Sequence, residues 1–153
     1  MPTRYKGSAT EVLALDTFIK MVRSLNAVQA QLLPALQKES GLTESQFGVL
    51  EAIHHLGPLT QTQLCAKILR SGSNVTTVID NLERDGLVRR ERGANDRRVQ
   101  LVSLTPKGDE LIRRILPVHV SRITTVLGAL SEQEQRELGR VCRKLGSASV
   151  SSA

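Results

Sequence analysis

TQTQLCAKILRSGSNVTTVIDNLERDGLVRRERGANDRRVQLVSLT, residues 60–105, decides the fold of this chain. The stretch predicts two short helices and then a basic two-stranded ribbon, with Gly93-Ala94-Asn95-Asp96 as its turn. A helix pair followed by a charged hairpin is how a small domain sets one helix in a major groove and a loop against the neighbouring DNA backbone. The stretch therefore predicts binding to duplex DNA.

Capping residues set the limits of the two helices. Thr60-Gln61-Thr62-Gln63 is a capping box that opens a short helix ending at Ile68 or Leu69. Ser71-Gly72-Ser73 supplies a turn and a cap, and the second helix runs from there to about Arg84. Apolar residues recur on this second helix at i, i+3, i+4 and i+7, which predicts a buried face made of Val75, Val78, Ile79 and Leu82.

The opposite face of the second helix carries small polar side chains. Such side chains hydrogen-bond base edges and phosphates without steric bulk. With the residue that precedes the turn, the predicted DNA-reading set is Arg70, Ser73, Asn74, Thr76, Thr77, Asn81 and Arg84. On an isolated helix we would interpret these residues as a solvated, well-capped face. The short helix before it and the hairpin after it favour DNA instead.

The ribbon is strongly basic. Five arginines, offset by Glu91 and Asp96, fall within ten positions: Arg89, Arg90, Arg92, Arg97 and Arg98. A basic loop of this shape suits phosphate contact or insertion into a narrow minor groove. A solvated, salt-bridged hairpin is the alternative. Both can hold, because an Asp96–Arg98 pair would keep the loop rigid while Arg97 faces the DNA.

Length and composition limit the kind of protein. With 153 residues, 40% of them hydrophobic and 24% charged, the chain is one globular domain, with or without an appended element. The net charge of +6 favours an anionic partner. Tyr5, Phe18 and Phe47 are the only aromatic residues, which disfavours surfaces that stack single-stranded bases. No apolar run approaches the ~20 residues of a membrane span, and residues 1–10 lack the apolar core of a signal peptide, so we expect a cytoplasmic protein.

Long amphipathic helices flank the DNA-binding stretch. One is predicted over residues 11–38, where Pro34 should kink the helix or split off its last turn. Another follows Thr105 and runs to residue 129, with Pro117 expected to bend it. A third opens at a capping box over residues 131–134. The apolar faces of these helices are too long for a compact DNA-binding unit to cover.

Pairing of two chains would bury those faces. It would also place two recognition helices about one helical turn apart, ~34 Å. An intramolecular bundle is the less favoured alternative. We therefore expect a single domain over residues 11–146, mostly α with a small β-wing. In it, 60–105 is the winged helix-turn-helix, 11–38 and 106–146 are dimerisation helices, and 1–10 and 147–153 are flexible tails.

The wing carries the most specific motif of the chain. Its pattern Asp-x-Arg-x5-Leu-Thr, met by Asp96, Arg98, Leu104 and Thr105, resembles that of the MarR family of bacterial regulators. Residues 42–47, 57–59 and 81–88 also look like this family, and the resemblance covers about residues 16–145. It implies a winged helix-turn-helix in an obligate homodimer that binds a palindromic operator. It further implies repression that a small molecule or an oxidant relieves.

The resemblance also implies where an effector would bind. In the family, the effector cleft lies between the dimerisation helices and the winged domain. By position in that fold, the residues expected to line it are Phe18, Val22, Phe47 and His54. The expected effector is a small aromatic, phenolic or quinone-like compound.

Two alternatives to this reading stay open. Redox control would act through Cys142 or Cys65, although free cysteines are most often buried structural residues. The peroxide-sensing branch of the family places its reactive cysteine in the first helix, where this chain has none. The second alternative is an architectural winged-helix protein without an effector.

Catalytic and metal-binding motifs are missing from the sequence. It contains no P-loop, Gly-x-Gly-x-x-Gly, nucleophile elbow or His-Glu-x-x-His. His54 and His55 are adjacent and point about 100° apart on a helix, so they cannot grip one metal together. We therefore expect neither an enzyme nor a cofactor or metal site.

Overall fold

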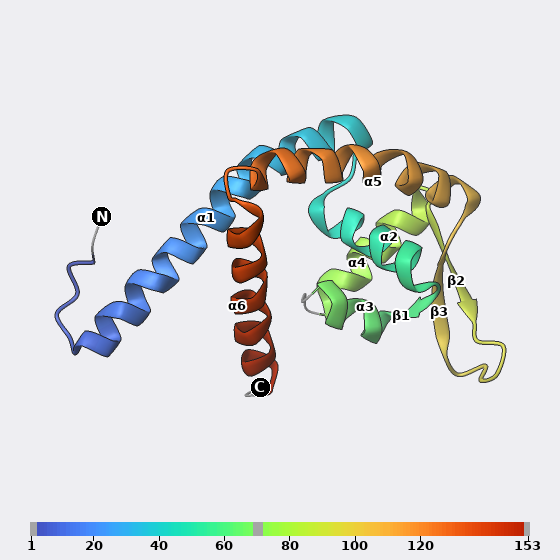
Figure 1. Cartoon of the computed structure of the whole chain (residues 1–153). Coiled ribbons are helices and arrows are strands. Elements are labelled where there is room, and N and C mark those ends of the chain that lie inside the picture. The colour runs from blue at the N-terminus through green and yellow to red at the C-terminus, as the bar shows by residue number, and fades with distance from the viewer. Residues whose placement is uncertain (1–2, 69–71, 152–153) are drawn as a thin grey trace. The chain divides into compact units, whose positions relative to one another are not determined.

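A computed structural model of the chain describes residues 3–68 and 72–151, which are mostly helical with one small sheet (Figure 1). The elements in chain order are α1 (Ala9–Ser40), α2 (Glu44–Leu56), β1 (Leu59–Thr60), α3 (Gln61–Ile68), α4 (Gly72–Arg84), β2 (Val88–Arg92), β3 (Gln100–Leu104), α5 (Pro106–Leu127) and α6 (Glu132–Ser151). The chain divides into two compact units after His119, within α5. The predicted fold class is confirmed. Across the described residues, no helix has both the length and the hydropathy that crossing a bilayer requires.

The winged unit is built around one apolar core. Helices α2, α3 and α4 each bury one face, and the sheet lies beside them (Figure 1). The fully enclosed side chains include Leu50, Leu64, Ile79, Leu82 and Ile112. Burial of one such side chain contributes about 1.5–3 kcal/mol to the free energy of unfolding. The apolar stripe predicted for α4 is confirmed, with Val75, Ile79 and Leu82 inaccessible and Val78 half-buried.

The capping box predicted at the start of α3 forms, and α2 begins with one as well. Thr43 Oγ1 accepts the backbone N–H of Gln46 at 3.2 Å, and Gln46 Oε1 accepts that of Thr43 at 3.0 Å. Thr60 and Gln63 make the same reciprocal pair at 3.2 and 2.9 Å. These side chains satisfy N–H groups that lack a partner inside the helix, so each helix begins at a defined residue.

The sheet has one strand more than the sequence predicts. Its order is β1-β3-β2 and all pairs are antiparallel, with Leu59 opposite Val102 in the added pair. Strand β1 has only two residues, which is too short for the alternation that identifies a strand in a sequence. Its partner lies about forty residues further along the chain. Only tertiary pairing therefore defines β1.

Helix α1 is longer than predicted, whereas α5 ends at Leu127, two residues before the expected boundary. Helix α1 is one element through Pro34, where we expected a kink or a separate last turn, and α5 continues through Pro117. A proline inside a helix removes one N–H donor, and the residues on either side keep their own bonds. Helix α1 also begins earlier, because Ser8 and Glu11 form a capping box.

Helix α6 passes the expected boundary at residue 146. It runs to Ser151, and the Ser149 hydroxyl donates to the carbonyl oxygen of Leu145 at 2.9 Å. Small residues without Gly or Pro follow position 146, so nothing in the local sequence stops the helix.

Candidate nucleic-acid interface

Helix α4 presents the polar face that the sequence predicts. Asn74, Thr77 and Arg84 are exposed, on the side away from the buried stripe. Ser73 lies in the first turn of α4, and Arg70 lies outside the described residues. The helix therefore offers a row of hydrogen-bonding side chains to a ligand outside the fold. A helix that carries such a row of side chains fits into a major groove.

Thr76 occupies a different position from the rest of this set. It is half-buried, and its hydroxyl accepts a hydrogen bond from Gln61 Nε2 at 2.5 Å. Asn81 is half-buried as well. The Gln61–Thr76 bond joins α3 to α4, so Thr76 orients the recognition helix from its flank. Sequence reasoning missed Gln61, because nothing in the local pattern indicates a contact fifteen residues away.

The wing turn is held by the carboxylate of Asp96. Its Oδ1 accepts the backbone N–H of Arg98 at 3.0 Å. Two backbone bonds close the loop around it, from Val99 N–H to the Asp96 carbonyl at 3.1 Å and from Gly93 N–H to the Val99 carbonyl at 2.8 Å. Asp side chains that accept a backbone N–H two residues on are typical of tight turns. Asp96 thus gives the loop its shape.

The Arg98 guanidinium contributes little to that shape. It lies 4.0 Å from Asp96 and its side chain is 96% exposed. An exposed ion pair at this distance is worth about 0–1 kcal/mol. Arg97 is exposed too, so both side chains of the loop are available to phosphates.

Arg90 is the exception within the basic ribbon. Its side chain is only 19% exposed and pairs with Asp80 at 2.6 Å and Glu83 at 2.8 Å, both on α4. Burial works against its charge, but the hydrogen bonds and charges of these carboxylates outweigh it and raise the pKa of Arg90 above its ordinary value. Arg90 therefore follows the salt-bridged alternative, with its partners on α4. Arg89 stays exposed and pairs with Glu91.

A rigid turn connects α4 to β2. Gly86 adopts φ 73°, and the bonds Gly86 N–H to the Glu83 carbonyl and Leu87 N–H to the Leu82 carbonyl form a Schellman motif. The Thr105 hydroxyl donates to the Gly86 carbonyl at 2.6 Å. These bonds explain the threonine of the wing motif, since it fastens the base of the ribbon to the end of α4.

The start of α5 packs against the same turn. Thr105 N–H donates to the Leu87 carbonyl at 3.1 Å, and Thr105 Oγ1 accepts the N–H of Gly108 at 3.1 Å. A Cβ at Gly108 would collide with the carbonyl oxygen of Leu87. Only glycine allows this approach of helix to backbone.

These features together define a winged helix-turn-helix DNA-binding protein. The MarR family model matches residues 42–99. The HTH-type transcriptional regulator YkoM of Bacillus subtilis is 38% identical over 109 residues, which is 71% of each chain. The HTH-type transcriptional repressor MdtR of the same organism is 26% identical over 140 residues, 92% of this chain and 90% of MdtR. The chain therefore belongs to the MarR family.

A solved complex supports the same assignment. Sco3205, a MarR family transcriptional regulator from Streptomyces coelicolor in complex with DNA, superimposes with a TM-score of 0.80 at 26% identity. The match covers 94% of this chain and 91% of that one. The protein is a DNA-binding transcriptional regulator and not an enzyme.

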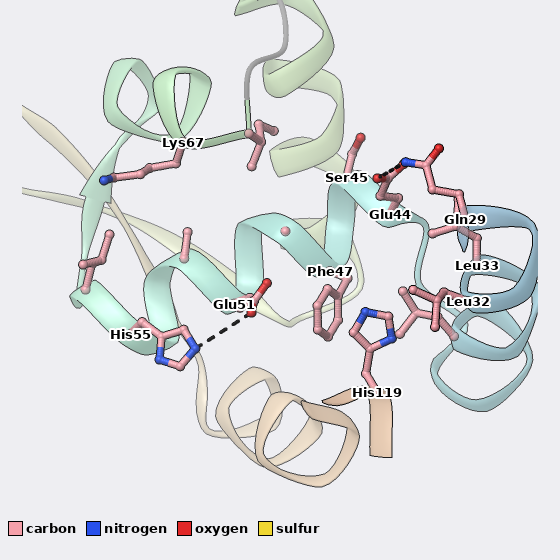
Figure 2. A pocket seen from close by; sticks show the side chains of 15 residues that line it. Gln29, Leu32, Leu33, Glu44, Ser45, Phe47, Glu51, His55, Lys67 and His119 are labelled. Atoms are coloured by element: carbon pink, nitrogen blue, oxygen red, sulfur yellow. Dashed lines mark hydrogen bonds and ion pairs between the residues drawn. The ribbon is translucent and has the colours of Figure 1, made fainter. Parts of the chain in front are cut away.

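A cavity of about 530 Å³ lies within the first unit (Figure 2). Its walls come from α1, α2, α3 and His119. Figure 2 shows Phe47 and His119 side by side, and their ring centroids are 4.8 Å apart in an edge arrangement. Polar residues also line it, with Gln29 Nε2 bonded to Glu44 Oε1 at 3.0 Å and Lys67 on α3.

Of the residues predicted to line an effector cleft, only Phe47 lines this cavity. Phe18 and Val22 are exposed on α1, ahead of its first lining residue, Gln29. His54 instead points its Nδ1 to Asp109 Oδ1 at 3.8 Å. Phe18, Val22 and His54 therefore lie outside this cavity. Helical periodicity identifies a face, but it does not show which length of α1 meets the winged unit.

The two cysteines differ in exposure. Cys65 is half-buried and packs against the core, as expected for a structural residue. Cys142 is exposed on α6, where the apolar stripe predicted a buried side chain. The described residues of α6 are exposed, so the second unit by itself does not cover the stripe.

Proposed function

We propose that this regulator is a homodimeric repressor that binds a palindromic operator and leaves it when a small aromatic effector occupies the cavity. The observation that carries the operator binding is the exposed polar face of α4 beside a rigid basic wing. In this proposal Ser73, Asn74, Thr77 and Arg84 contact bases, and Arg97 and Arg98 grip phosphates. Repression is supported by MdtR, which is a repressor.

The homodimer is supported by apolar side chains that the single chain leaves exposed. On α1 these are Leu13, Phe18 and Leu25, and on α6 they are Leu138, Val141 and Leu145. Large apolar patches on a folded protein mark interaction surfaces. A two-fold dimer places two recognition helices on successive turns of one DNA face, about 34 Å apart, which requires a palindrome.

Selection of bound fragments from genomic DNA tests the operator. A sequence-specific regulator should prefer its selected palindrome over random duplex by about 10³ or more at physiological salt. Sedimentation of the complex should give two chains per palindrome. Equal affinity for random DNA would instead identify an architectural binder and overturn the proposal.

The effector is supported by the chemistry of the cavity. Leucines, Phe47 and His119 form its walls, while Lys67 and Gln29 offer hydrogen bonds around it. A planar aromatic compound with one acidic group matches this combination. Thermal-shift screening with small aromatic acids and phenols should raise the Tm, and the same compounds should lower operator affinity.

A variant that fills the cavity gives the matched control. Leu33→Trp should abolish the thermal shift without changing operator affinity in the absence of compound. Lys38→Ala, at an exposed position outside the cavity, should keep both responses. If Leu33→Trp still responds fully, the effector binds elsewhere.

A further inference from the structure

Strand β2 sends one arginine inward. Side chains on a strand alternate between its two faces, so Arg90 shares the face of Val88, which is 2% exposed. Its cross-strand neighbour is Val102, also 2% exposed. Arg89 lies on the other face with its side chain 56% exposed. The two adjacent arginines therefore meet different surroundings.

Arg90 makes three bonds to one turn of α4. Its Nη2 bonds Asp80 Oδ1 at 2.6 Å, its Nη1 bonds Glu83 Oε1 at 2.8 Å, and its backbone N–H donates to Glu83 Oε2 at 3.2 Å. Asp80 and Glu83 are three residues apart, so both carboxylates project from the same side of the helix. A guanidinium has a rigid fork of donors that can hold both at once, and a lysine ammonium does not.

These bonds are a second attachment between the recognition helix and the ribbon. The first is the turn at Gly86, fastened by Thr105. The pairing of β1 with β3 holds the other edge of the ribbon and does not involve α4. Arg90 holds the ribbon again at the third residue of β2, roughly 7 Å along the strand from Val88 at ~3.3 Å per residue. Two attachments fix the direction of the ribbon relative to α4.

We propose that Arg90 is a positioning residue for DNA binding: it sets the angle between recognition helix and wing so that both engage one half-site together. It is not a phosphate contact, although it stands in the basic run. Asp80 and Glu83 act with it. The inference rests on the proposed operator binding, because it concerns how two parts of one interface are held in register.

A double-mutant cycle on the full-length protein tests it. Operator and random duplex affinities are measured over a range of salt for Arg90→Gln, Arg97→Ala and the combination, with Arg89→Gln as the matched control. Arg90→Gln should lower operator affinity about tenfold. In the Arg90→Gln background, Arg97→Ala should lower operator affinity very little further, because a wing that pivots no longer holds Arg97 against the DNA. Its salt slope should match that of the parent, whereas Arg89→Gln should leave the effect of Arg97→Ala at full size.

Other outcomes overturn the proposal. A fall in salt slope of about one on Arg90→Gln would make it a phosphate contact. Additive effects of Arg90→Gln and Arg97→Ala would make Arg90 a stabilising residue only. If the parent protein does not prefer the selected operator, the proposed function fails instead, and this is seen before any variant is compared.

A second variant covers the case in which Arg90→Gln does not fold. Asp80→Asn with Glu83→Gln keeps Arg90 and every hydrogen-bond acceptor but removes both charges. It should show the same non-additivity with Arg97→Ala, to a smaller extent. Arg90→Lys should fall between the parent and Arg90→Gln, because an ammonium lacks the fork. Full additivity in both variants would contradict the assignment.

Discussion

Apolar side chains are buried in the winged unit and exposed on the helical faces outside it. In the winged unit Leu50, Leu64 and Ile79 are completely inaccessible. On α6, Leu138, Val141 and Leu145 are 44–49% exposed. The winged unit completes its core from its own residues, whereas α6 carries an exposed apolar stripe. We infer that the winged unit is stable within one chain and that α6 pairs with a second chain.

The largest effect is expected from Gly108→Ala, which tests the packing of the winged unit. A methyl group there meets the backbone carbonyl of Leu87, which cannot move without opening the turn between α4 and β2. We expect the free energy of unfolding to fall by about 3 kcal/mol, measured by urea denaturation. Gly139→Ala on α6 is the control, since its Cβ meets nothing within 4 Å. A control as destabilised as Gly108→Ala would contradict the contrast.

Charge on the apolar stripe of α6 tests the pairing region. Leu138→Asp should raise the dissociation constant of the dimer about 100-fold, because it places a carboxylate in a buried interface. Analytical ultracentrifugation measures this. Arg143→Asp, on the opposite face, should leave the dimer intact. If Leu138→Asp remains dimeric at low concentration, α6 does not pair as proposed.

Two residues of the wing allow the effect of loop shape to be separated from the effect of charge. Asp96→Ala removes the acceptor for the Arg98 backbone N–H, so operator affinity should fall about tenfold with dimerisation unchanged. Arg98→Ala removes an exposed cation and should lower the salt slope by about one. Fluorescence anisotropy across a salt series distinguishes the two. An equal loss of slope in both variants would show that Asp96 acts through Arg98 alone.

The smallest effect is expected at the start of α1. Hydrogen bonds from Ser8, its backbone N–H first and then its hydroxyl, lower the pKa of the Glu11 carboxyl. The capping box therefore contributes fully above the unfolded pKa of Glu11, and the contribution is lost as pH falls through the lower folded value. NMR titration should show the Glu11 carboxyl titrating below the ordinary value for a glutamate. A pKa at or above that ordinary value would contradict the capping box.

Local signals in the sequence were sufficient for most of the winged unit. The capping box at Thr60 and the stripe of Val75, Ile79 and Leu82 each depend on residues within one or two turns, so spacing alone predicts them. The alternation of side chains in β2 also contained the clue to Arg90, since it shares a face with Val88. Counting arginines as one basic run concealed that clue.

Contacts between distant segments could not be predicted in this way. The bond from Gln61 to Thr76, the pairing of Leu59 with Val102 and the approach of Phe47 to His119 all join separate elements. Amino-acid spacing carries no information on how elements are docked. Periodicity therefore pointed to Phe47, which lines the cavity, but also to Phe18, Val22 and His54, which do not.

The sequence by itself determined that this chain has capped helices, a recognition helix with one polar face, and a basic wing. Those features depend on hydrogen bonds and periodicity over a few residues. Only the tertiary structure decided which of those polar residues face outward, because burial depends on every neighbour at once. Thr76 and Arg90 became parts of the scaffold, and Arg97 and Arg98 stayed at the surface.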